Sequence, residues 1–150
     1  RYVQTPTVAS IHAAAAKLGL PLMLKSRLGA YDGRGNAVLK STSDADIEIA
    51  LSSLGMSGVD NEKELDLYAE GWVDFRAEIA VMVIRSSNGE VKAYPAANAI
   101  QTDSICRVVL TPARSVPPHI REQCEAIATK AVTSLGEGAS GAFGVELFWT

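Results

Sequence analysis

The sequence lacks the features that mark several classes of protein. None of its apolar runs approaches the roughly 20 residues needed to cross a bilayer, and Arg1 opens onto a polar segment, not onto the apolar core of a signal peptide. The formal net charge is −3, so there is no basic field to attract nucleic acid. We therefore expect a cytoplasmic protein with no nucleic-acid partner and no membrane partner.

Cysteine and histidine are equally scarce. Cys106 and Cys124 have no cysteine or histidine nearby at the spacing of metal ligands. We expect both thiols to be reduced and packed in the interior, as in a reducing cytosolic compartment. His12 and His119 have no partners at catalytic spacing, and Ser140 lacks the histidine and aspartate context of a nucleophilic triad.

The composition that remains is that of an ordinary globular protein. Of the 150 residues, 47% are hydrophobic and 21% are charged, which suits one modest domain or two small subdomains with a real core. The chain does not begin with methionine and ends in a run that resembles a strand. We therefore expect it to be a piece of a longer protein.

Helical and strand periodicities alternate along the chain. Thr7 can cap a helix that runs to Leu18, Ser43 and Asp46 form a start like a capping box, and Pro117 opens a long third helix. Strands are predicted over residues 21–26, 37–40, 65–73, 78–85, 91–94, 105–110 and 142–149. This order predicts an α+β fold, with a small α+β unit over residues 1–63 and a largely antiparallel sheet with one helix over residues 64–150.

Two apolar patterns predict what these elements bury. Residues 79–84 are apolar without alternation, which is typical of a strand covered on both faces. The third helix carries an apolar stripe that we expect to pack against the sheet. The members of the stripe are Ile120, Cys124, Ile127, Ala128, Ala131 and Leu135.

A glycine-rich loop follows the strand predicted over residues 21–26. Gly29, Gly33 and Gly35 fall within seven residues, next to Arg34. Glycines allow backbone N–H groups to turn toward an anion, and a guanidinium is suited to phosphate. The loop matches neither a Walker A loop nor a dinucleotide fingerprint. It is either a phosphate-binding loop or a tight hairpin turn at the surface.

Several charged residues lie near the ends of predicted strands. Lys25 ends an apolar strand, where its ammonium either meets a phosphate as a point charge or lies in solvent. The segment Tyr68–Val73 can offer backbone groups to a purine edge, as a hinge does. The carboxylate of Glu78 either accepts hydrogen bonds from two ribose hydroxyls or forms an ion pair with Arg76 or Arg85.

Glu146 lies inside the apolar run 143–149. Alternation places Val145, Leu147 and Trp149 on one face of the strand and Glu146 with Phe148 on the other. An isolated ionised carboxylate in such a strand would cost several kcal/mol unless it were paired or bound to a metal. A Mg²⁺ ion shared with substrate phosphates would resolve this cost, and so would a buried ion pair with a basic residue.

Together these segments are similar to one known family. The similarity is carried by residues 24–27, 30–36 and 68–73, and by shorter matches within 75–85, 89–91, 94–95, 103–106, 112–114 and 144–148. They resemble the ATP-grasp domain of phosphoribosylaminoimidazole carboxylase of the ATPase type, also called N5-carboxyaminoimidazole ribonucleotide synthetase. The resemblance covers nearly the whole chain, and the Tyr-Asp-Gly-Arg-Gly stretch at residues 31–35 is highly specific. Ala30 and Asn36 are more similar to the fungal and plant bifunctional proteins than to the bacterial ones.

The resemblance implies an ATP-grasp fold, in which two small α+β subdomains bind ATP between them. Residues 1–63 would form the small lid subdomain with the glycine-rich loop, and residues 64–150 the start of the larger subdomain, truncated at its C-terminal end. Such enzymes use ATP and bicarbonate to carboxylate the exocyclic amine of 5-aminoimidazole ribonucleotide in purine biosynthesis, through carboxyphosphate. The full-length protein would be a homo-oligomer.

The resemblance also assigns roles in the first half of the chain. Lys25 would contact the ATP phosphates, and the loop from Tyr31 to Gly35 would close over the phosphates and the aminoimidazole substrate. Asp32, near the amine, and Arg34 would be the catalytic residues. These roles agree with the chemistry, because phosphoryl transfer needs positioning and charge neutralisation, not a protein nucleophile.

Further roles fall in the second half, and the implied cofactors are ATP and Mg²⁺. Glu70 and Val73 would meet adenine through backbone groups, and Glu78 would bind the ribose hydroxyls. Glu146 would be the first of two Mg²⁺ ligands.

Two positions depart from the family pattern, and parts of the family's site lie outside the chain. Asn98 and Gln101 stand where the family usually has an acidic or amide residue and a histidine, which bears on the substrate side. The second metal-binding glutamate would follow Thr150, and the N-terminal substrate-binding subdomain would precede Arg1. We therefore expect the chain alone to lack a complete site and to be inactive.

Two other functions are compatible with the same residues. One is a different ATP-grasp ligase, similar to biotin carboxylase or to a formate-using transformylase, which shares the lysine, the glycine loop and the Mg²⁺ carboxylate. The other is a nucleotide-binding module without turnover.

Overall fold

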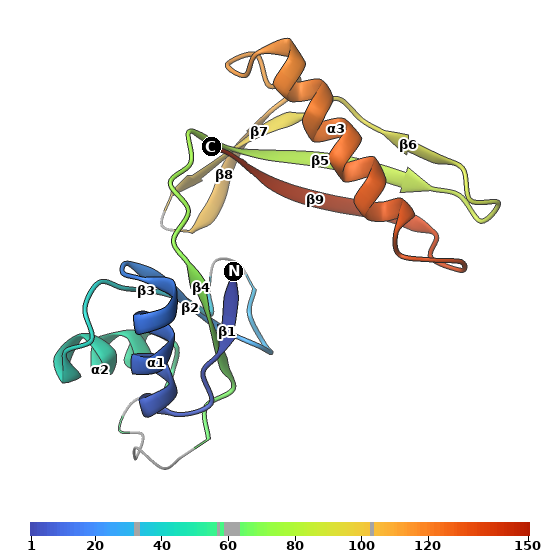
Figure 1. Cartoon of the computed structure of the whole chain (residues 1–150). Coiled ribbons are helices and arrows are strands. Elements are labelled where there is room, and N and C mark those ends of the chain that lie inside the picture. Colours follow the sequence, from blue (N-terminus) through green and yellow to red (C-terminus); the bar gives the residue numbers. More distant parts are fainter. Residues whose placement is uncertain (32–33, 57, 59–63, 103) are drawn as a thin grey trace. The chain divides into compact units, whose positions relative to one another are not determined.

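The computed structural model describes residues 1–31, 34–56, 58, 64–102 and 104–150, and it confirms the α+β class. Compactness divides the chain into two units. Unit 1 consists mainly of Arg1–Val73, and unit 2 consists of Asp74–Thr102 and Cys106–Thr150. Each unit has a sheet and a hydrophobic core of its own (Figure 1).

The sheet of unit 1 has four strands in the order β1-β4-β2-β3, and every pairing is antiparallel. The strands are β1 (Tyr2–Gln4), β2 (Leu22–Ser26), β3 (Asn36–Leu39) and β4 (Leu67–Gly71). Helices α1 (Val8–Leu18) and α2 (Asp44–Ser53) bury side chains in one cluster with alternate strand residues, among them Leu24 and Leu67. Both helices therefore pack on the same face of this sheet.

Both helices of unit 1 begin where the sequence predicts. The backbone N–H of Ser10 donates to Thr7 Oγ1 at 3.2 Å and the N–H of Thr7 donates to Ser10 Oγ at 2.9 Å, which completes a capping box. The N–H of Asp46 donates to Ser43 Oγ at 3.2 Å at the start of α2. Gly19, with a φ of +84°, ends α1 in a conformation that glycine adopts without steric cost.

Strand β4 determines where unit 1 ends. It pairs with both β1 and β2, so residues 67–71 belong to the sheet of unit 1. The composition of loop 55–63 predicts a boundary after residue 63, and residues 57 and 59–63 of that loop lie outside the described residues. The compact division instead falls after Val73, because β4 completes the first sheet. The assignment of residues 1–63 and 64–150 to the two ATP-grasp subdomains stays a prediction.

Unit 2 is built around a central strand, β5 (Ala77–Arg85). Strand β9 (Gly141–Trp149) pairs with it along one edge, while β6 (Val91–Ala93) and β7 (Ala97–Thr102) share the other edge. Strand β8 (Ile105–Leu110) lies next to β7, and α3 (Pro118–Thr133) crosses one face of the sheet (Figure 1). This is the largely antiparallel sheet with a helix that the sequence predicts.

The expectation that β5 is covered on both faces is wrong for this chain. Ile79, Val81 and Val83 are fully buried against α3, whereas Met82 is 47% exposed and Ile84 is 39% exposed. The strand therefore alternates in burial although its sequence does not alternate in polarity. The reason is that α3, the helix of unit 2 in the described part of the chain, covers one face of the sheet.

The apolar stripe predicted for α3 is correct at its centre and wrong at its edges. Cys124 and Ala128 are buried, and so is Val132, which the prediction omitted. Ile127 is 53% exposed and Leu135, beyond the end of the helix, is 56% exposed. The buried positions follow a strict four-residue spacing, which forms one narrow row on the helix surface.

Two strands of the structure were not predicted from the sequence. Strands β1 and β7 escape prediction because the first has three residues and the second begins with Ala97–Ala99, residues with little strand preference.

Cys106 is exposed on β8, contrary to expectation. Cys124 is buried as expected, and burial raises the pKa of its thiol, with a further contribution from the charge of Glu125.

No helix in the part of the chain that the structure describes is long and apolar enough to cross a membrane.

The packing of α3 predicts that truncating its smaller side chain, Val132, destabilises the protein more than truncating the larger one, Ile127. Val132→Ala should lower the free energy of unfolding by about 2 kcal/mol, because it leaves a cavity beneath the helix. Ile127→Ala removes a larger side chain, yet it should cost less than about 1 kcal/mol, because Ile127 is largely solvated and alanine favours the helix. Urea unfolding measures both, followed by tryptophan fluorescence in a Trp72→Phe background, so that the signal comes from Trp149, which packs on this core. A larger cost for Ile127→Ala would contradict the described packing.

Candidate functional site

Among the described residues, no helix covers one of the two faces of the sheet of unit 1, and the predicted site residues of β2 and β4 lie on that face. Leu22 and Leu24 point into the core, so Met23 and Lys25 point to the other side. The same alternation along β4 buries Leu67 and Ala69 and leaves Tyr68 and Glu70 half-buried. The cross-strand partner of Lys25 is Tyr68, and that of Met23 is Glu70.

Lys25 is held by two neighbours on β4. Its Nζ donates to Oε2 of Glu70 at 3.1 Å and lies 6.0 Å from the centroid of the Tyr68 ring. The side chains of Lys25 and Glu70 are 31% and 42% exposed, so water reaches both ends of the ion pair. An ammonium has three donors and Glu70 accepts from one of them, so Lys25 retains capacity for a phosphate.

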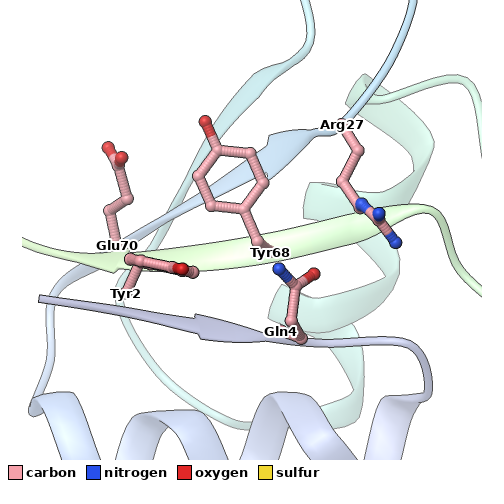
Figure 2. Close-up of a pocket in the computed structure, with 5 residues that line it drawn as sticks. All are labelled: Tyr2, Gln4, Arg27, Tyr68 and Glu70. Atoms are coloured by element: carbon pink, nitrogen blue, oxygen red, sulfur yellow. The ribbon is translucent and has the colours of Figure 1, made fainter.

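A shallow pocket of about 380 Å³ adjoins this ion pair on the same sheet. Its lining residues are Tyr2, Gln4, Arg27, Tyr68 and Glu70 (Figure 2). The rings of Tyr2 and Tyr68 meet edge to face with centroids 6.4 Å apart, and Nε of Arg27 lies 3.4 Å from Oδ1 of Asp66. Sequence reasoning did not single out Tyr2, Gln4 or Tyr68 as individual side chains, although Tyr68 stands two residues before Glu70 and strand alternation could have placed it on the same face.

The glycine-rich loop joins β2 to β3, and its described part is tightly folded. Gly35 has a φ of +83°, and a Cβ placed on it would lie 2.7 Å from Cβ of Ala30, so no other residue fits there without displacement. Its carbonyl accepts from the N–H of Ser26 at 2.8 Å. Asp32 and Gly33 lie outside the described residues.

Arg34 folds back onto Tyr31 within this loop. The guanidinium donates to Oη of Tyr31 at 3.2 Å and stands 5.4 Å from the ring centroid, and the N–H of Arg34 donates to the carbonyl of Tyr31 at 2.8 Å. Both residues are exposed. The pair gives the guanidinium a defined position at the surface of the loop.

In unit 2, Glu78 and Glu146 lie on the face of the sheet opposite to α3. Glu78 of β5 is opposite Phe148 of β9, and Ala80 is opposite Glu146, so the two carboxylates are diagonal neighbours on adjacent strands. Phe148 stacks on Phe75 with a centroid separation of 4.5 Å beside them. The predicted division of β9, with Val145, Leu147 and Trp149 toward the core, is confirmed.

The premise that Glu146 is buried is wrong. Glu146 is exposed, and among the described residues it forms no ion pair. Apolar neighbours along the sequence suggested burial, but Val145 and Leu147, which flank Glu146, point to the other face of the sheet. The carboxylate therefore needs no partner to offset desolvation, and it is free to bind a ligand from solvent.

Glu78 and Asn98 occupy opposite faces of the same sheet. Glu78 is half-buried and forms no ion pair with Arg76 or Arg85 within the described residues. Asn98 pairs with Ile79 on the core side, is 8% exposed and accepts from Oγ of Ser115 at 2.8 Å. The departure from the family pattern at Asn98 therefore falls in the core and not on the face of Glu78.

No group of three or more histidine, cysteine, aspartate or glutamate side chains that could hold a metal ion occurs in the described ranges. A cation at Glu146 would therefore take most of its ligands from elsewhere. This donor set fits Mg²⁺, which keeps several waters and binds through one or two carboxylates together with substrate phosphates.

Comparison with known proteins agrees with these features. Residues 1–150 match the ATP-grasp domain family. The phosphoribosylaminoimidazole carboxylase of Candida albicans is 45% identical over 147 residues, which are 97% of this chain and 23% of that protein.

Two crystal structures of proteins from Aspergillus clavatus are similar over 99% of the chain and 35% of their own length. Carboxyaminoimidazole ribonucleotide synthase complexed with ATP is 38% identical with a TM-score of 0.80. N5-carboxyaminoimidazole synthase in complex with ADP and 5-aminoimidazole ribonucleotide is 35% identical with a TM-score of 0.78.

The chain spans about a quarter of the length of the curated relatives that it matches, 23% for the protein of Candida albicans and 24% for that of Schizosaccharomyces pombe. The comparisons confirm both the ATP-grasp fold and the resemblance found in the sequence. The family match extends over every residue of the chain, and on that ground the chain belongs to the ATP-grasp family.

Proposed function

We propose that the chain is the ATP-binding part of an enzyme that carboxylates the exocyclic amine of 5-aminoimidazole ribonucleotide with bicarbonate in purine biosynthesis. The observation that carries this proposal is similarity over 99% of the chain to a structure that holds ADP and 5-aminoimidazole ribonucleotide. The similarity to phosphoribosylaminoimidazole carboxylases at 45% identity supports the same reaction. The full-length protein would act in the cytoplasm as a homo-oligomer.

The reaction needs two transfers. A bicarbonate oxygen attacks the γ-phosphorus of ATP and ADP leaves, which gives carboxyphosphate. The amine nitrogen then attacks the carboxyl carbon and phosphate leaves, while the amine loses a proton. Neither step needs a protein nucleophile, so the protein contributes position and charge.

Unit 1 would supply the groups that hold the phosphates. Lys25 has the charge and two remaining donors for phosphate oxygens, and it lies on the sheet face opposite to α1 and α2. Tyr31, Gly33 and Gly35 would form the loop over the phosphates, with Arg34 neutralising charge and Asp32 accepting the proton of the amine. Figure 2 shows that Glu70 projects from the sheet beside Tyr68.

The end of β4 and unit 2 would supply the remaining contacts. Backbone groups of Val73, beyond the end of β4, would meet adenine, and Glu78 would accept hydrogen bonds from the ribose hydroxyls. Glu146 would hold Mg²⁺, which would polarise the phosphate oxygens when bound. The exposed position of Glu146, on the same sheet face as Glu78, supports this role.

The reaction itself is tested in the full-length enzyme. ADP release from ATP and bicarbonate should rise severalfold when 5-aminoimidazole ribonucleotide is added, and Asp32→Ala should abolish that rise while ATP still binds. Biotin and formate acceptors serve as controls for other ATP-grasp ligases. ADP release that is indifferent to the aminoimidazole nucleotide would overturn the proposed acceptor, and unchanged stimulation in Asp32→Ala would remove Asp32 from its role.

A second prediction concerns the phosphates. Lys25→Met should weaken ADP binding about tenfold or more and leave adenosine binding unchanged, because a hydrogen bond to a charged group contributes roughly 1.5–3 kcal/mol. Isothermal titration measures both ligands. Lys40→Met is the matched control, because it removes the same charge from an exposed position at the end of β3. Equal losses for ADP and adenosine would argue against a phosphate contact.

A third prediction concerns the metal. In the wild type, Mg²⁺ should tighten ADP binding, and Glu146→Gln should reduce this tightening by about tenfold, because a neutral amide is a weaker ligand for a hard cation. Titration of ADP with and without Mg²⁺ gives the ratio. Glu137→Gln, in the exposed loop before β9, should leave the ratio unchanged. A metal dependence like that of the wild type in Glu146→Gln would exclude the carboxylate as a ligand.

A further inference from the structure

The ion pair between Lys25 and Glu70 differs from the other ion pairs of the described residues. Its N–O distance is 3.1 Å, against 3.4 Å for the pairs Arg27–Asp66 and Lys92–Glu90. It is also less exposed than those two pairs, at 31% and 42% for its two side chains. It joins residues 45 positions apart in the sequence, so the fold and not chain proximity brings them together.

The sheet fixes the geometry of this pair. Glu70 and Lys25 are diagonal neighbours on adjacent strands, since the direct partners are Met23 for Glu70 and Tyr68 for Lys25. The ring of Tyr68 lies beneath the ammonium. A carboxylate on one side and an aromatic ring on another restrict the rotamers that the long lysine side chain can adopt.

The backbone of Glu70 is directed into the sheet. The N–H of Gly71 donates to the carbonyl of Arg1 at 3.1 Å, on the side of β1. Alternation along an antiparallel strand then directs the N–H and C=O of Glu70 to the opposite side, toward Met23 of β2. The side chain is therefore the part of Glu70 that reaches the helix-free face.

We propose that the Glu70 side chain is a positioning residue, which holds the Lys25 ammonium in place to receive a nucleotide phosphate. This inference rests on the proposed function, because it assumes that Lys25 binds phosphate. It gives Glu70 a role through its carboxylate, because its backbone groups are directed toward Met23 of β2 and not toward a ligand. Glu70 acts through Lys25 and does not touch the reacting atoms.

The charges of Glu70 and Lys25 determine whether removal of the Glu70 carboxylate weakens or tightens phosphate binding. Glu70 is negative, so it also repels a phosphate, and its removal could in principle tighten binding. A phosphate bound to the free donors of Lys25 would lie farther from the carboxylate than the ammonium does, however, so the repulsion would act over the longer distance. Both side chains are partly solvated, and water screens this longer interaction more than the direct contact. The restraint on Lys25 should therefore dominate.

The experiment compares ADP with adenosine in the full-length enzyme by isothermal titration. Glu70→Ala should weaken ADP binding about fivefold and leave adenosine binding unchanged, and Glu70→Gln should lie between wild type and Glu70→Ala because its amide oxygen still accepts a hydrogen bond. In a Lys25→Met background, Glu70→Ala should have no further effect on ADP. This coupling is what a merely structural role would not produce.

Asp66→Ala is the matched control. It removes the carboxylate of another ion pair of unit 1, that of Asp66 with Arg27, and it changes the net charge by the same amount as Glu70→Ala. Its ADP affinity should equal that of the wild type. Tighter ADP binding in Glu70→Ala would show that the carboxylate competes with phosphate, and equal losses for ADP and adenosine would show a structural effect. Either result overturns the inference. If Lys25→Met itself left ADP binding unchanged, the phosphate role in the proposed function would fail instead.

Discussion

The alternation of side chains along the strands is the constraint on which the candidate site depends. In each unit the helices cover one face of an antiparallel sheet, and every second residue of a strand is committed to that core. The intervening residues face the other way, and there the structure places Lys25, Tyr68 and Glu70 in unit 1 and Glu78 with Glu146 in unit 2. A charged residue can follow directly after a buried leucine without any cost of burying charge, because the two side chains never share an environment.

Local signals in the sequence were sufficient for much of the fold. The capping residues Thr7 and Ser43 specify helix starts through hydrogen bonds within one turn, so they can be read from the chain itself. Strand β7 could not be read in this way, because its alanines are drawn into a sheet by the neighbours β5 and β8 and not by their own preference. Periodicity also predicts wrongly that Ile127 of α3 is buried. The number of helix positions that are buried depends on how the helix lies on the sheet, and the sequence of the helix alone does not specify this.

The sequence proposes the candidate site as a set of residues, but it does not contain the contacts between them. Lysine, glycine and glutamate at the observed positions could be selected from their chemistry and from family resemblance. The ion pair between Lys25 and Glu70 depends on the register of β2 against β4, which joins segments 45 residues apart. For Glu146 the sequence predicts burial wrongly. Its apolar neighbours in sequence suggested a buried charge, but burial is decided by what covers a face, and α3 covers the other one.

The pairing register of β4 links the stability of unit 1 to the contact between Lys25 and Glu70. A slip of β4 by one residue would turn Tyr68 and Glu70 into the core and Leu67 and Ala69 toward water, because the side-chain period of a strand is two. Burying the carboxylate without its partner would cost several kcal/mol, in addition to the apolar burial lost. A slip by two residues would keep the faces but separate Glu70 from Lys25. The core therefore excludes the first error strongly, while β1, which pairs with β4 from Tyr2 to Gln4, helps to exclude the second. Strand β1 therefore does more than add three paired residues to the sheet. It helps to hold β4 in register, and β4 carries Glu70, the partner of Lys25.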